Sequence, residues 1–217
     1  MDHNLDFFAN RNRRLAGVSL LLICVLLAGC SSEPSKPTTK PAVKGPELLT
    51  GRSAFQKSFI TARGWAHDAT PFRLESIPTN EGNGQDGKWA IWRSSFASPS
   101  QRGVKPYFWS GSATPDAPSR GVSPGNEDNY SPSNASTQVF DIAFLKIDSE
   151  QAFAIAQKHG GEKITSKDPA AIVIYVCDFD HNTNQLVWHV IYGAKRETAK
   201  LTVALDASTG EFIREEK

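Results

Sequence analysis

The sequence predicts an α+β fold in which helices pack on an antiparallel sheet, organised as two related units. Segments 51–67 and 149–159 carry apolar residues at helical spacing. Each is followed by short strand-like apolar runs that polar turns separate. Trp92 and Trp188 stand in corresponding runs, 96 residues apart in the 217-residue chain. The shared order of elements indicates a duplicated unit of one helix and several strands.

The chain opens with the pattern of a secretory signal. Three arginines form a basic head, an apolar run covers residues 15–27, and small residues lead up to Cys30. The apolar run is shorter than the roughly 20 residues that a membrane-spanning helix needs. A membrane helix and plain secretion remain the alternatives to a cleaved and lipidated signal.

The end of this signal, Leu27-Ala28-Gly29-Cys30, resembles the lipobox of bacterial lipoproteins. The resemblance implies cleavage between Gly29 and Cys30, removal of residues 1–29 and attachment of acyl chains such as palmitate to Cys30. More than one acyl chain holds a domain firmly on a bilayer. Ser31 and Ser32 follow, without the Asp that often retains such proteins at the inner membrane. The resemblance therefore implies an outer-membrane lipoprotein that faces the periplasm.

Residues 30–47 are rich in Pro, Ser, Thr and Lys and predict a flexible tether. Residues 48–109 form the predicted first unit. Thr50 is the expected N-cap of its helix. Its expected strands cover residues 72–77, 88–96 and 104–109.

Residues 110–136 contain almost no apolar side chains and predict an irregular loop, either mobile or laid against the surface. Trp109 and Tyr130, at its start and within it, are candidate contacts for a partner such as a glycan or an envelope protein. The alternative is a tolerated insertion without a binding role.

Residues 137–217 form the predicted second unit, which begins with a strand over 139–145. Asp148 and Gln151 then predict a capping box at the start of a helix that Gly160-Gly161 ends. Further strands are expected over 171–179, 185–192, 200–205 and 211–213.

The second unit resembles the PepSY domain. The resemblance lies in Trp188-His189-Val190 and in the run from Val203 to Glu211, where a strand ends in Asp and a Thr-Gly turn follows. It covers residues 147–213, and residues 50–109 are a fainter version without the Thr-Gly turn. The resemblance implies a small non-catalytic module that binds or restrains a partner, as in peptidase propeptides. Trp188 alternates with Leu186 and Val190, which predicts a side chain in the core.

Composition excludes some classes of partner and leaves others open. Residues 30–217 hold 21 basic and 21 acidic side chains, so no charge excess indicates a nucleic-acid ligand. Cys177 is the one cysteine of this part that is free of the lipobox, so no disulfide can form within it. It lies in an apolar run and is expected to be a small buried side chain. A nucleophilic thiol with His181 or His189 is the sharper alternative.

Two motifs suggest chemistry, but their contexts argue against it. The Gly121-Val122-Ser123-Pro124-Gly125 run matches a nucleophile elbow, yet it lies in the predicted loop without the required strand and helix. Oxygen-bearing residues at positions 178, 180, 182 and 184 imitate a calcium loop, but Thr183 and His189 stand where glycine and glutamate are needed. His189 is expected at the surface. We therefore predict no catalytic residue, no metal and no cofactor.

Three functions follow from these observations. The first is a membrane-anchored lipoprotein whose PepSY-like units bind or inhibit an envelope protein, with a peptidase as one candidate. The second is a scaffolding lipoprotein that spaces other envelope proteins. The third is a hydrolase that uses Ser123 or Cys177.

Overall fold

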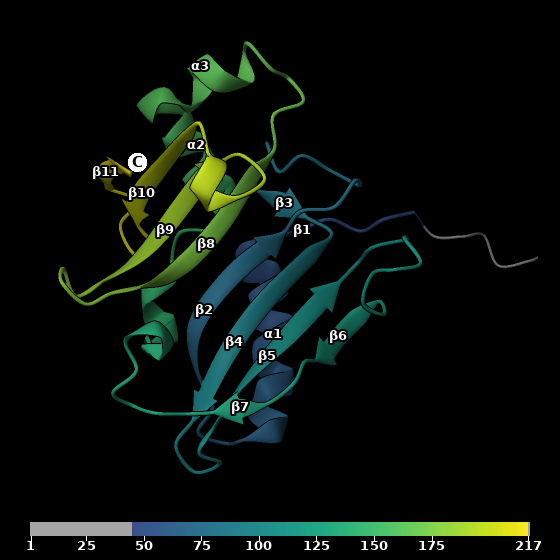
Figure 1. Ribbon diagram of the computed structural model, residues 1–217, viewed down its shortest axis with the longest axis vertical. Helices are drawn as coiled ribbons and strands as arrows, with labels where there is room; N and C mark the ends of the chain where they lie inside the picture. The colour runs from purple at the N-terminus through teal and green to yellow at the C-terminus, as the bar shows by residue number, and fades with distance from the viewer. Residues whose placement is uncertain (1–44, 217) are drawn as a thin grey trace, which may run out of the picture. The chain divides into compact units, whose positions relative to one another are not determined.

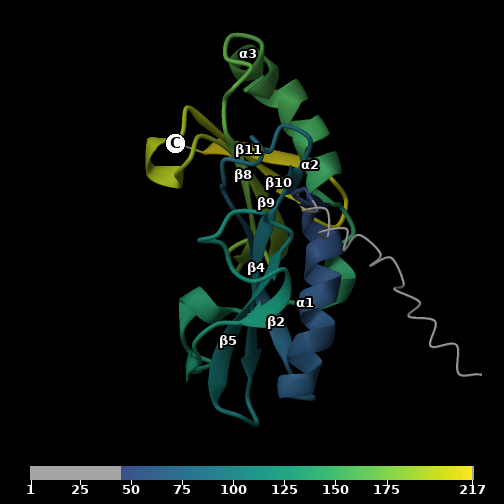
Figure 2. The same cartoon turned by 90° about the vertical axis from the view of Figure 1, so that its right-hand side faces the viewer.

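One antiparallel sheet with helices along one face forms the part of the chain that the computed structural model describes, residues 45–216 (Figure 1). Helices α1 (Gly51–Trp65) and α2 (Ser149–Ala156) lie on the same side of this sheet (Figure 2). The predicted α+β class is confirmed.

The sheet consists of nine strands, all of them antiparallel to their neighbours. Its order is β11-β10-β9-β8-β2-β4-β5-β6, and β7 pairs with β5 beside this path. The strands are β2 (Thr70–Ile77), β4 (Ile91–Ser98), β5 (Gly103–Ser110), β6 (Gly121–Pro124), β7 (Asp128–Asn129), β8 (Val173–Asp180), β9 (Gln185–Tyr192), β10 (Leu201–Asp206) and β11 (Phe212–Glu216). A separate pair joins β1 (Leu49–Thr50) to β3 (Lys88–Trp89).

Short helical turns complete the fold. The 3₁₀ turns are η1 (Ala135–Thr137), η2 (Ile142–Phe144) and η4 (Arg196–Thr198). A π-helical turn, η3 (Gln157–Gly161), follows α2 and leads into α3 (Glu162–Thr165). The predicted glycine stop holds at Gly160, whose φ of 100° lies in the left-handed region. Helical structure then resumes in α3, which the sequence pattern did not predict.

Strands β2 and β8 pair in the middle of the sheet and so connect its two ends, β11-β10-β9-β8 and β2-β4-β5-β6. Helix α1 packs on β2, β4 and β5, whereas α2 packs on β9 and β10. In the join, Leu74 lies opposite Cys177 and Glu75 lies opposite Val176. The helix-and-strand groups therefore share one continuous sheet.

The core lies between the sheet and the two helices. Trp92 and Trp188 are fully buried, and the ring of Tyr175 packs against both. The indole of Trp92 donates to the carbonyl of Leu49 at 2.8 Å, and that of Trp188 donates to the carbonyl of Ile147 at 2.9 Å. Each tryptophan thus fixes the chain just before a helix, and its one polar group is satisfied.

The start of α1 is capped by the start of α2. A carboxylate oxygen of Asp148 accepts from the backbone N–H of Ser149 at 2.7 Å and from that of Arg52 at 2.9 Å. The hydroxyl of Ser149 accepts from the backbone N–H of Gly51 at 2.8 Å. Thr50 is the N-cap by position, as expected, but its side chain makes no capping hydrogen bond. The predicted capping box of α2 is confirmed, and it also serves the first helix.

The strand expected over residues 139–145 is wrong. The segment instead turns through η2, because the carboxylate of Asp141 accepts from the backbone N–H of Ala143 and caps a 3₁₀ turn. Phe140 and Leu145 reach the core, but Ile142 stays exposed. The sequence of this segment resembled a strand because apolar and polar residues are mixed in it. The structure shows that only some of its apolar side chains contact the core.

The loop expected over residues 110–136 is also more regular than the sequence indicated. Its residues Gly121–Pro124 form β6, which pairs with β5, and Asp128–Asn129 form β7. These polar residues are strands because their backbones pair with β5. Backbone pairing does not depend on apolar side chains, so the hydrophobic pattern could not predict it.

Candidate functional site

The face of the sheet opposite the helices carries a row of paired charges, which we call the arginine ladder. It crosses the sheet from β4 to β11 and includes residues of both ends of the sheet. Its members are Arg93, Glu75, Arg73, Asp178, His189, Glu216, Arg196, Arg214 and Asp180.

Arg73 links the two ends of the sheet within this ladder. Its guanidinium contacts the carboxylates of Glu75 and Asp178, each at 3.0 Å. Arg93 of β4 pairs with the other oxygen of Glu75. Because Asp178 lies on β8, these pairs cross the β2–β8 join and hold its register.

His189 is the centre of the ladder and is only 5% exposed. Its Nε2 lies 3.2 Å from a carboxylate oxygen of Asp178, and its Nδ1 lies 2.8 Å from one of Glu216. Burial alone would lower the pKa of His189, but hydrogen bonds to the two carboxylates raise it above its usual value. The expectation that His189 lies at the surface is wrong, because these partners and the strands around it cover the ring.

The pKa values of the two carboxyl groups shift in the opposite direction. Burial would raise the pKa of Glu216, but the His189 hydrogen bond and nearby arginines lower it to about 2. Asp178 behaves likewise, and its pKa is lowered by His189 and Arg73 against the effect of burial. Both groups are thus favoured as carboxylates, and their charges in turn favour the protonated form of the imidazole between them.

The ladder presents its cations outward and keeps its anions beneath. The side chains of its four arginines are 36–43% exposed, whereas its carboxylates are 12–27% exposed. Arg196 and Arg214 border a cleft of about 430 Å³ that Phe179 and His181 also line. The outer layer therefore offers fixed guanidinium groups, which suit carboxylates or other anions of a ligand.

The candidate partner contacts Trp109 and Tyr130 are not brought together. Trp109 is 3% exposed and packs in the core, so its assignment as a partner contact is wrong. Tyr130 is half-buried near the β4–β5 hairpin, where its backbone N–H donates to the carbonyl of Arg102. Since Trp109 pairs with Val122 near the far end of β5, the two aromatic residues belong to opposite ends of that strand.

The residues of the rejected chemical motifs have ordinary structural places. Cys177 is fully buried, and burial raises the pKa of its thiol, as does the nearby Asp178. Ser123 lies in the edge strand β6, opposite Phe108. In residues 45–216, no three His, Cys, Asp or Glu side chains are grouped as ligands of a metal ion. Asp180 stabilises the turn between β8 and β9, where its carboxylate accepts from the backbone N–H of Asn182 at 2.9 Å.

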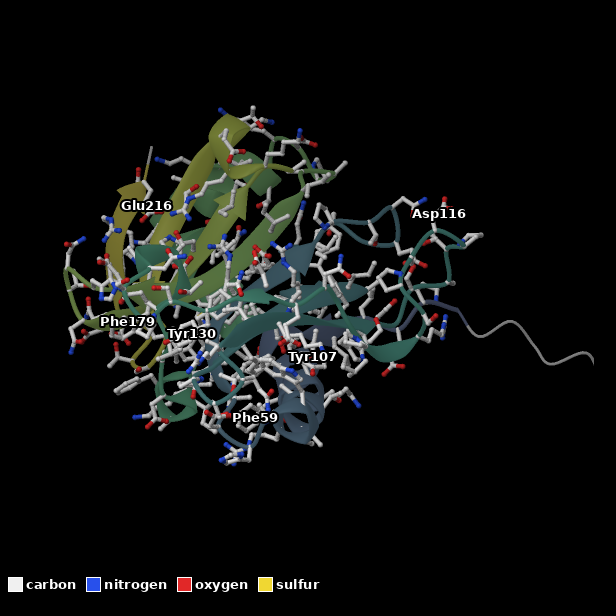
Figure 3. The ribbon with its side chains drawn as sticks, turned by 60° about the horizontal axis from the view of Figure 1, so that its bottom comes forward. Phe59, Tyr107, Asp116, Tyr130, Phe179 and Glu216 are labelled. Atoms are coloured by element: carbon white, nitrogen blue, oxygen red, sulfur yellow. The ribbon has the colours of Figure 1, made fainter. Side chains whose placement is uncertain are left out.

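A second surface feature lies on the helix side of the sheet, and we call it the α1 groove. It has a volume of about 320 Å³. Its lining residues are Arg52, Phe55, Gln56, Phe59, Ile60, Ile142 and Leu145. Figure 3 labels Phe59 on α1, and Glu216 of the arginine ladder lies beside the C-terminal strands.

The predicted lipidation and cleavage residues, Cys30 and Gly29, lie outside the described residues, as does most of the tether. Within residues 45–216, no helix combines the length and the apolar character that crossing a bilayer requires.

The comparisons with known proteins give one structural relative. No protein-family model and no curated protein matches this chain. A crystal structure described as a "putative lipoprotein" from Clostridium difficile 630 is similar, with a TM-score of 0.51 and 11% sequence identity. The alignment covers 75% of this chain and 91% of that protein. At this identity the likeness shows a shared fold, and the present chain has the α+β architecture of that protein.

Proposed function

We propose that this protein is a lipid-anchored cell-envelope protein whose body is a non-catalytic binding module. The support for the anchor is the lipobox-like ending of the signal at Cys30, together with a structural relative that is itself described as a lipoprotein. The absence of Asp after Cys30 favours the outer membrane, with the body in the periplasm. Residues 30–47 would connect the lipid on Cys30 to the body.

The anchor is tested by replacing Cys30 with Ser. The variant should leave the membrane fraction and lose labelled palmitate, because the acyl chains depend on that sulfur. A variant that still sediments with membranes and takes up as much palmitate would remove this part of the proposal.

The observation that supports a binding role is the outward layer of guanidinium groups on the arginine ladder. These groups are held in place by carboxylates beneath them, so a partner would meet a preorganised surface. Arginine presents a planar fork that suits carboxylates. We therefore assign the partner as an envelope protein with an exposed acidic segment, and an envelope peptidase restrained by the module is one candidate.

The PepSY-like character and the duplication belong to the same proposal. Trp92 and Trp188 stand 96 residues apart, and each donates to the carbonyl two residues before its helix. Their cross-strand partners, Trp109 and Leu205, stand 96 residues apart as well. Ser76 lies opposite Trp92 and Cys177 lies opposite Trp188, and these two positions flank the Glu75–Val176 pair at the β2–β8 join. These equal offsets support two related units that have fused their sheets.

The binding role is tested by capture of partners from solubilised envelope. The wild-type protein should retain one protein in stoichiometric amount, and a variant with Arg196→Gln and Arg214→Gln should lose it. Lys163→Gln, an exposed cation on α3, is the matched control and should keep it. Equal capture by both variants would exclude the ladder as the binding surface.

The scaffold and the hydrolase are the remaining candidates. A scaffold would retain several envelope components in variable amounts. A hydrolase would turn over ester or peptide libraries, and Ser123→Ala or Cys177→Ala would abolish that turnover.

A further inference from the structure

Most exposed apolar side chains of the described residues belong to the two segments that line the α1 groove, and Ile60 and Ile142 are in its lining. Five large apolar side chains are exposed within residues 45–216, and four of them belong to α1 or to the segment around η2. They are Ile60, Val139, Ile142 and Phe144. Ile60 is 74% exposed, and it lines the groove opposite Ile142. Such a concentration of exposed apolar surface marks a contact with something other than water.

The helix that lines one side of this groove is cationic. Helix α1 carries Arg52, Lys57 and Arg63 and contains no acidic residue. The guanidinium of Arg63 lies 5.9 Å from the ring centre of Phe59. The segment around η2 carries one exposed charge of each sign, Asp141 before η2 and Lys146 after it. A helix that combines exposed apolar residues with such cations is typical of a membrane surface.

The length of chain between Cys30 and the body limits how far the α1 groove can lie from the membrane. Cys30 and Gly45 are 15 residues apart, so an extended tether spans about 50 Å at most. The chain enters the body at Glu47, whose backbone N–H donates to the carbonyl of Gly111, and α1 begins four residues later. The start of α1 therefore follows directly on the point where the tether enters the body. This step rests on the proposed lipid anchor.

We propose that the α1 groove docks on the anionic lipid surface to which the protein is anchored. Ile60, Ile142 and Phe144 enter the boundary between headgroups and acyl chains, and the cations of α1 contact anionic headgroups. The arginine ladder lies on the opposite face of the sheet, so docking leaves it directed away from the bilayer (Figure 2). The acyl chains supply most of the attachment, and docking orients the body.

A fluorescent label at the groove tests this proposal. Ile60→Cys is introduced into the full chain, which is purified in its native form and labelled with an environment-sensitive fluorophore; the buried Cys177 is protected from the label. The protein is mixed with vesicles of phosphatidylcholine alone or with phosphatidylglycerol. Emission should shift to shorter wavelength on the anionic vesicles. The matched control is Phe212→Cys, an exposed apolar position on β11, which should show no shift.

The charge dependence gives a second measurement. Replacing Lys57 and Arg63 with Gln should weaken the docking equilibrium about fivefold for each cation removed. Flotation of the vesicles reports the lipid anchor separately, so a protein that floats without a shift has an anchor but no docked body. No shift on either vesicle, or an equal shift on both, would overturn the proposal. A shift that appears only with soluble envelope extract would assign the groove to a protein partner and would overturn it as well.

Discussion

Asp148 is the side chain whose loss should disturb both helices at once. In Asp148→Ala, α2 loses its N-cap, which costs about 1 kcal/mol. The backbone N–H of Arg52 in the first turn of α1 also loses a charged acceptor that now lies at 2.9 Å, and such hydrogen bonds contribute about 1.5–3 kcal/mol. The expected loss in the free energy of unfolding is therefore about 2–4 kcal/mol. In a body of this size that lowers Tm by about 4–16 °C.

Two matched variants separate the double role from ordinary capping. Asp141→Ala removes an aspartate that caps only η2 and should cost about 1 kcal/mol. Thr50→Ala removes the N-cap of α1 by position, but its side chain makes no capping bond, so the variant should lose less. Urea unfolding of all three, monitored by circular dichroism, ranks them. If Asp148→Ala cost no more than Asp141→Ala, the shared cap would not contribute to stability.

Four further outcomes follow from the structure. Because the pKa of His189 is raised, its stabilisation is complete below about pH 6.5 and is lost as pH rises through the folded pKa. The difference in Tm between wild type and His189→Gln should therefore shrink from pH 6 to pH 9, and a constant difference would contradict the charged pairing. The pKa of Glu216 is lowered to about 2, so its carboxylate stabilises the fold fully at pH values above the ordinary glutamate pKa and progressively less as the pH falls toward 2. Glu216→Gln should therefore cost less stability at pH 3 than at pH 6. Trp188→Ala should cost about 3–5 kcal/mol in urea unfolding because the side chain is fully buried, and a Tm within about 2 °C of wild type would contradict that role. Gly161→Ala should also destabilise, as measured by its Tm, since an added Cβ would collide with the Tyr192 hydroxyl.

Local patterns predicted the elements that bury one regular face. The strand at Gln185–Tyr192 has the predicted bounds, because its core face alternates through Leu186, Trp188 and Val190. The capping box at Asp148 was also predicted, since the cap and Gln151 are neighbours in sequence. Periodicity and capping are local, and the sequence reports them directly.

Features that depend on distant partners could not be predicted in the same way. Asp148 reaches the first turn of α1 across 96 residues, and no local signal marks that contact. His189 is covered because Glu216 returns on β11, although alternation did place it on the face opposite Trp188. Trp109 was assigned to a loop contact because the residues after it are polar, but its own strand faces the core.

The arginine ladder was missed for the same reason. Its members come from five strands and one 3₁₀ turn, and they are charged residues that look like solvated positions when each is considered alone. The available signal was weak: Arg73, Glu75, Asp178 and His189 all occupy outward positions of predicted strands. Only the register of β2 against β8 shows that these positions meet.

The most direct test of the account is site-specific photo-crosslinking in living cells. A photo-crosslinking amino acid is placed at position 214, on the arginine ladder, and in a second strain at position 60, on α1. The account predicts a single protein adduct from position 214 and lipid adducts without a protein adduct from position 60. A protein adduct from position 60, or none from position 214, would contradict the proposed orientation of a binding module on its membrane.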